Sequence, residues 1–181
     1  MNRLAIIKSC YQRSAINIGN WTADLSLLFL RLLAARVFYM SGRTKWNGLF
    51  QFNEQKYDLF MYEFFCPEPV REGALQLCNP ETLDYEEGSA IVGVIKALAV
   101  SAGIMEILLP LLLLIGLFTR FAALGLLAMT LFIQLAIFPE WSHWWNPAAW
   151  WAVALFAVLS IGPGRLSLDR VFGLDSVKRS L

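Results

Sequence analysis

Residues 90–138 decide the fold, and they read AIVGVIKALAVSAGIMEILLPLLLLIGLFTRFAALGLLAMTLFIQLAIF. This stretch holds two apolar runs, Ala90–Gly116 and Phe121–Phe138, which are separated by only four residues. Each run is long enough to cross a hydrocarbon core of roughly 30 Å as a helix. Because such a short connection joins antiparallel neighbours, the stretch predicts a transmembrane helical hairpin.

The composition favours a membrane protein and excludes several other classes. The chain has 181 residues, of which 57% are hydrophobic and 16% charged, whereas soluble domains carry about 25% charged residues. A formal net charge of +1 without a basic run argues against nucleic-acid binding. The first 24 residues mix polar and apolar types without a signal-peptide pattern, so we expect the apolar helices to direct insertion. Three cysteines and one histidine give no metal-binding spacing, so no metal site is predicted.

We predict a single membrane domain over residues 1–181, an all-α integral membrane four-helix bundle. A lone segment in lipid must satisfy its own backbone hydrogen bonds, so each span is expected to be a helix. A long outer loop, residues 43–89, joins the first two helices. The predicted spans are residues 21–42, 90–116, 121–138 and 147–162.

The distribution of Lys and Arg predicts that both termini lie in the cytoplasm. In the loop 43–89, nine acids outnumber four basic residues, and the short loop 139–146 has no Lys or Arg. These two loops are therefore expected outside. The segments expected inside carry the basic residues Arg3, Lys8, Arg13, Arg120, Arg165, Arg170, Lys178 and Arg179.

Two charged residues are predicted to meet inside the bundle. With the middle of each span as the bilayer centre, Arg31 lies near the centre and Glu106 about three residues, roughly 5 Å, from it. Arg suits a desolvated carboxylate because it can bind both oxygens. We therefore predict an Arg31–Glu106 ion pair, which either locks the bundle or serves as a proton relay or polar anchor for a quinone head group. Gly103 lies on the same helix face and allows a neighbouring helix or ligand to approach.

Two further candidates lie nearer the outer end. Arg36 is roughly 140° from Arg31 around the helix, so the two cannot easily share a partner. We expect Arg36 to reach Glu140, an acid of the outer loop or an anionic ligand. His143 is a candidate proton donor near a quinone at the outer rim, and the alternative is an interfacial residue without a catalytic role.

The cysteines divide into a pair and a single residue. Cys66 and Cys78 both lie in the outer loop, where an oxidising exterior favours a disulfide that pins the loop. A redox-active pair is the alternative, although the spacing differs from the close spacing of thiol-exchange motifs. Cys10 is expected to be free in the cytoplasm.

An ordered set of short motifs resembles a known family. The first span contains LRLLAA at residues 30–35, the hairpin contains GIME at 103–106 and GLFTR at 116–120, and the last span ends with GPGRLSLD at 162–169. Together they resemble the DoxX family of small four-helix membrane proteins. The chain departs from the family pattern in its long outer loop and at Ala35, Arg36 and Pro110.

The resemblance implies a bacterial inner-membrane protein tied to redox or sulfur metabolism. Relatives include subunits of a thiosulfate:quinone oxidoreductase, so the resemblance favours an accessory subunit of such a complex, with quinone as its cofactor. The chain has no motif for flavin, nicotinamide or haem, so electrons would come through a diffusible quinone or a partner subunit. More distant relatives imply an alternative, a non-catalytic assembly factor or cargo receptor that uses the acidic outer loop. Besides the lipid bilayer, we expect a protein partner or a homo-oligomer and no nucleic acid.

Overall fold

The structure is a computed structural model, and it describes residues 3–48, 50–86 and 88–175. Three of the charged residues that bear on orientation, Glu87, Lys178 and Arg179, lie outside this part of the chain. In chain order the elements are α1 (Arg3–Arg43), β1 (Trp46–Gly48), β2 (Gln51–Phe52), α2 (Gln55–Asp58), the π-helix η1 (Leu59–Phe64), α3 (Ala90–Ile115), α4 (Thr119–Phe132), the π-helix η2 (Ile133–Ile137), α5 (Trp141–His143), the π-helix η3 (Trp144–Ala148), α6 (Ala149–Ile161) and α7 (Leu168–Val171).

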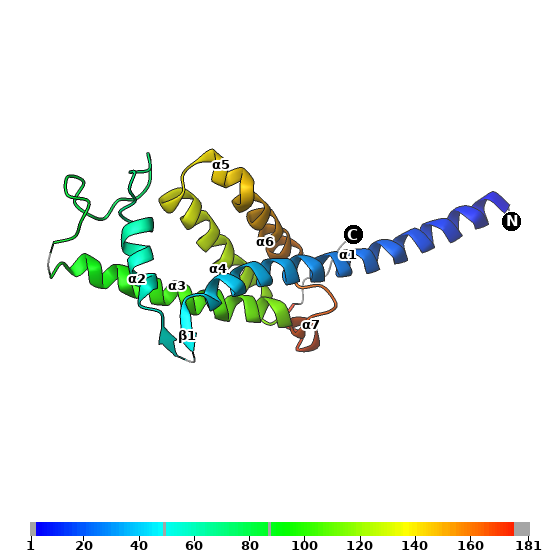
Figure 1. Cartoon of the computed structure of the whole chain (residues 1–181). Helices are drawn as coiled ribbons and strands as arrows, with labels where there is room; N and C mark the ends of the chain where they lie inside the picture. The colour runs from blue at the N-terminus through cyan, green and yellow to red at the C-terminus, as the bar shows by residue number, and fades with distance from the viewer. Residues whose placement is uncertain (1–2, 49, 87, 176–181) are drawn as a thin grey trace.

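The predicted all-α membrane bundle is confirmed. Four helical stretches are long and apolar enough to cross a membrane. Within the bundle, α1 packs against α3 and α6, and α4 packs against α3 and α6 (Figure 1). The side of the membrane that each end faces stays a prediction. The four stretches are Ile7–Arg43, Ala90–Ile115, Thr119–Ile137 and Trp141–Ile161.

The first helix is much longer than the predicted span 21–42. α1 has 41 residues and is therefore about 60 Å long, roughly twice the thickness of the hydrocarbon core. Its N-terminal half projects away from the other helices (Figure 1). The sequence pattern did not predict this extension, because polar residues interrupt the apolar run there, although residues 3–24 contain no proline to break the helix. Which part of α1 crosses the membrane stays a prediction.

The last span also begins earlier than predicted, at Trp141 instead of residue 147. Asn146 has a non-helical backbone (φ −150°, ψ 99°), so the chain bends there before the regular helix α6. The residue before a proline is pushed out of the helical region, and Pro147 follows Asn146. Sequence periodicity therefore detected only the regular part of this span.

A tight turn joins α3 to α4 as predicted. Gly116 ends α3 in the left-handed region (φ 72°), and the amides of Gly116 and Leu117 donate to the Leu112 carbonyl. This is a common helix ending that favours glycine. At the start of α4, the amides of its N-cap Phe118 and of its first residue Thr119 donate to the Asp169 carboxylate at 2.7 and 2.8 Å. We call this end of the bundle the α7 end, because α7 packs here through Asp169.

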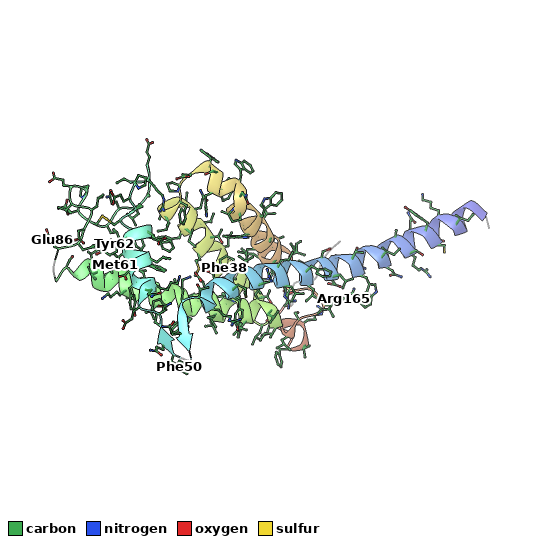
Figure 2. All side chains as sticks on the ribbon, viewed as in Figure 1. Phe38, Phe50, Met61, Tyr62, Glu86 and Arg165 are labelled. Carbon is green, nitrogen blue, oxygen red and sulfur yellow. A yellow bond between two sulfur atoms is a disulfide. The ribbon has the colours of Figure 1, made fainter. Side chains whose placement is uncertain are left out.

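Apolar side chains form two clusters. The first lies between α1, α3, α4 and α6, and its alanines let the helices approach closely. Figure 2 labels Phe38, which belongs to this cluster. The second lies where η1 covers α3 and η2. The first cluster is Ala34, Ala35, Phe38, Leu113, Ala122, Ala123, Leu126, Leu155 and Val158, and the second is Phe60, Phe65, Ile95, Ala99 and Ile137.

The loop between α1 and α3 is docked onto the bundle. It begins with the two-stranded hairpin β1–β2 and continues through α2 and η1. The Leu75 amide donates to the Ala136 carbonyl at 2.7 Å, which ties the loop to η2. The structure links Cys66 to Cys78, whose Cα atoms are 5.6 Å apart.

Candidate functional site

A buried ion pair joins the end of α1 to the inside of α3. The Lys45 ammonium lies 2.6 Å from a Glu106 carboxylate oxygen, and both side chains are less than a tenth exposed. The ammonium also donates to the Ser41 hydroxyl at 3.2 Å. Glu106 is ten residues from Gly116, so it lies about 15 Å along α3 from the turn at the α7 end. An ion pair at this depth is costly to insert, and pairing lowers that cost.

Close contact between two backbones holds this pair in place. A Cβ on Gly42 would lie 2.8 Å from the Glu106 carbonyl oxygen, so only glycine fits here. Pro110 lies inside α3 and has no N–H, so the Glu106 carbonyl loses its usual helical donor. The sequence thus places a proline and a glycine where α1 and α3 touch beside the charged pair.

Aromatic rings of the hairpin and α2 lie against α3 at Gly103, one turn before Glu106. The Trp46 indole N–H donates to the Gly103 carbonyl at 3.3 Å, and the Phe52 ring lies where a Gly103 side chain would project. The Phe52 and Tyr57 rings are 4.8 Å apart, and the Lys96 ammonium lies 5.6 Å above the Tyr57 ring. Gly103 therefore permits close approach as predicted from its size, and the neighbour that approaches is the hairpin.

The predicted Arg31–Glu106 pair is wrong. Arg31 is buried at the α7 end, where its guanidinium donates to four backbone carbonyls. The prediction failed because it took the middle of residues 21–42 as the centre of the bilayer. In the structure α1 extends far beyond that range, and Arg31 lies at one end of the bundle instead of its middle. The acceptors are the carbonyls of Leu113, Leu114, Pro163 and Leu166, at 2.8–2.9 Å.

Arg31 is consequently a structural clamp and not part of the site around Glu106. Its donors satisfy carbonyls that the end of α3 and the turn after α6 leave without helical partners. Nearby, the Asp24 carboxylate binds the Arg165 backbone amide at 3.1 Å and its guanidinium at 3.3 Å. The motif GPGRLSLD thus folds back onto α1.

His143 lies in a separate polar cluster. Its Nδ1 is 2.7 Å from the Gln134 side-chain oxygen, so Nδ1 donates and Gln134 fixes the ring. The imidazole stacks on Phe138 at 4.8 Å, and the Arg71 guanidinium lies 4.5 Å from the same ring. In the described part of the chain, no hydrogen bond or ring contact joins this cluster to Lys45 or Glu106.

Arg36 does not reach Glu140 or an acid of the outer loop in the described part of the chain, and the expected anionic ligand stays a prediction. Its side chain is exposed on α1, and among residues 3–48, 50–86 and 88–175 it has no ion pair or hydrogen-bonded partner. The expected contact with Glu140 is therefore absent in that part of the chain. Glu140 instead accepts a hydrogen bond from Ser142 at 3.2 Å.

A cavity of about 650 Å³ opens between the outer loop and the start of α5. It lies beside the Arg71–Phe138–His143 cluster and carries three glutamates and one arginine. Its lining residues are Glu68, Pro69, Val70, Arg71, Glu72, Pro139, Glu140 and Trp141.

Sequence reasoning missed the partner of Glu106. Lys45 follows α1 directly, and hydropathy alone assigns it to the charges of the outer loop. The signal that could have found it is the short run Gly42 to Trp46, in which a glycine, a lysine and a tryptophan follow an apolar span. Glu106 and Gly103 are brought together as predicted, whereas Arg31, Arg36 and His143 each lie elsewhere.

Comparison with known proteins agrees with the motifs. The model of the DoxX family matches residues 26–139, well over half of the chain. No curated protein and no solved structure gives a significant match. The matched region includes Arg31, the Lys45–Glu106 pair and the α3–α4 turn. The chain therefore belongs to the DoxX family, as the resemblance of its motifs predicted.

Proposed function

We propose that this chain is an accessory subunit of a quinone-linked redox or sulfur-handling complex in a bacterial inner membrane. The observation that supports the proposal best is the buried Lys45–Glu106 pair, because an acid inside a membrane span, here Glu106, is a default candidate for a functional site. Family membership supports the same conclusion, since the DoxX family is often linked to redox or quinone-related complexes.

Residues near the pair carry the kinds of group that a quinone head group would contact. A quinone offers two carbonyl oxygens, and Lys45 and Trp46 carry N–H donors that lie near Glu106 and Gly103. Phe52 and Tyr57 present aromatic rings of the kind that pack against a planar ring. When bound, a quinone accepts two electrons and two protons, and the electrons would come from a partner subunit.

Within this proposal, Lys45 and Glu106 have different roles. The Lys45 ammonium donates a hydrogen bond to a quinone oxygen, and the Glu106 carboxylate holds that ammonium in position. Trp46 and Phe52 limit the access of water to the pair.

The experiment is purification from native membranes in a mild detergent, followed by quantification of extracted quinone and identification of co-purifying subunits. We expect about one quinone per complex for the unaltered chain and a loss of at least tenfold in Glu106→Gln. Glu140→Gln is the matched control, because Glu140 is an exposed glutamate that lies outside the site around Glu106. Absence of quinone in the unaltered protein, or equal amounts in both variants, would contradict the proposal.

A second candidate function, an assembly factor or cargo receptor, is favoured by the outer cavity. The loop that carries the disulfide supplies Glu68 and Glu72, and Glu140 faces the same cavity of about 650 Å³. Such a surface suits a positively charged segment of another protein. Loss of a bound protein after Glu68→Gln with Glu72→Gln, without any quinone in the preparation, would favour this function over the first.

A further inference from the structure

One face of α1 carries exposed apolar side chains where the helix projects beyond the bundle, and an exposed arginine where it lies within the predicted span. At 100° per residue, nine exposed side chains fall within an arc of roughly 60°. Their face lies opposite the one that buries Leu27, Ala34 and Phe38 against the bundle. The nine are Ile7, Tyr11, Ser14, Ile18, Leu25, Phe29, Leu32, Arg36 and Arg43.

The half of this face that lies beyond the bundle is apolar except for Ser14. The part of α1 before Asp24 extends about 30 Å past the residues that anchor it at the α7 end, and Figure 1 shows it projecting without a neighbouring element. Ile7, Tyr11 and Ile18 are each more than 60% exposed there. An isolated helix of this length gains little stability in water by itself. An apolar stripe on it therefore indicates a surface that another molecule covers.

The half that lies within the span carries the charge of Arg36, which has no ion pair in the described part of the chain. Arg36 is 12 residues, about 18 Å, beyond Asp24 and seven residues, about 10 Å, before Arg43. Helical side chains leave the backbone toward the N-terminus, so Arg36 points away from the nearer end of the span. A charge that faces lipid at this depth is costly, and such residues are usually paired with a partner charge.

From these two observations we infer that this face of α1 docks a membrane-spanning helix of a different protein, one that carries an Asp or Glu opposite Arg36. The inference names the docking surface of the subunit role proposed above and rests on that role only in expecting a partner. A carboxylate satisfies Arg36, and an apolar helix face covers the stripe from Ile7 to Leu32.

A second copy of this chain fits the face less well. Two copies inserted with the same topology would bring their α1 helices together in parallel and in register. The two Arg36 side chains would then face each other at one depth inside the membrane, which is unfavourable. Charge complementarity thus favours a different protein over a homodimer.

Photo-crosslinking in native membranes tests the inference. A photoreactive phenylalanine analogue is placed at Phe29 or Ile18 on the face, and at Phe156 on the exposed side of α6 as the control position. We expect a discrete protein adduct from Phe29 and Ile18 and none from Phe156. The Phe29 adduct is expected to map to a spanning helix with an Asp or Glu within about one turn of the crosslinked residue.

Two arginine variants show whether the charge directs this contact. Arg36→Leu, which suits lipid better than arginine, is expected to lower the adduct yield about tenfold or more, whereas Arg13→Leu, on another side of α1, leaves it unchanged. Arg36→Glu is expected to restore the adduct when the partner's acid is changed to Arg. Lipid adducts only, an adduct with a second copy, or a protein adduct that Arg36→Leu does not reduce would each overturn the inference. Such a failure together with retained quinone would leave the quinone proposal intact.

Discussion

At the scale of single residues, Gly42 shows how closely α1 and α3 must approach. A Cβ at this position would lie 2.8 Å from the Glu106 carbonyl oxygen and 2.9 Å from its Cβ, so the contact is between backbones. We expect Gly42→Ala to lower the free energy of unfolding by about 1–3 kcal/mol, because the helices must move apart. Thermal unfolding in detergent measures this effect.

Gly19 provides the control for that prediction. It lies in the same helix, and no neighbouring atom lies within 4 Å of the position that a Cβ would occupy. Alanine favours a helix by about 1 kcal/mol over glycine, so Gly19→Ala should not destabilise the protein. Equal losses of stability in both variants would contradict the close contact at Gly42.

Arg31 differs from Arg36 although both lie on α1. The Arg31 guanidinium serves four carbonyls, and a lysine ammonium has neither the reach nor the planar fork to replace it. Arg31→Lys is expected to cost at least about 3 kcal/mol of stability, because buried carbonyls are left unpaired. Arg36→Lys is expected to cost little. The melting temperatures of the two variants check this, and similar values would show that Arg31 is not a clamp.

The candidate site was only partly predictable from the residues. Glu106 was found because one acid in a long apolar run is conspicuous. Its partner was not found, because pairing across helices depends on where each helix begins and on the angle at which two helices cross. Lys45 lies just outside the span by hydropathy, and only the packing of Gly42 on α3 brings it to Glu106.

At the scale of elements, hydropathy predicted the helices that are apolar along their whole length. α3 agrees to within one residue, because a capping serine precedes it and Gly116 ends it. The extension of α1 was missed because its polar residues hide a helix that is apolar on one face only. The hairpin at residues 46–52 was missed because its strands are too short for a periodic pattern. Figure 2 shows Phe50 at the outer edge of this hairpin.

The docked outer loop depends on its disulfide. Cys66 and Cys78 are 12 residues apart, and closing a loop of this size stabilises a fold by roughly 3 kcal/mol in the chain-entropy model. Mass spectrometry without reduction should find the two peptides linked. Cys66→Ser with Cys78→Ser should release the loop to limited proteolysis while the helices persist. Free thiols at both positions, in protein isolated from an oxidising exterior, would contradict the pairing.

At the scale of the whole molecule, Cys10 offers a test of orientation. It is the one free cysteine in the described part of the chain, and it is exposed on the projecting half of α1. The distribution of Lys and Arg predicts that this half lies in the cytoplasm. A membrane-impermeant maleimide should therefore label Cys10 in inside-out vesicles and leave it unlabelled in intact cells. Labelling in intact cells would reverse the predicted topology, and Cys10→Ser controls for other sites.

The central claim is that the Lys45–Glu106 pair binds a quinone head group inside the membrane. The most direct measurement is the affinity of a short-chain benzoquinone for the purified chain in lipid nanodiscs, followed by quenching of tryptophan fluorescence. We expect saturable binding to the unaltered chain and binding at least about tenfold weaker in Glu106→Gln and in Lys45→Met, since each loses a charge-assisted contact. Glu140→Gln should bind like the unaltered chain. Quenching that rises linearly without saturation, or equal affinity in all four proteins, would contradict the claim.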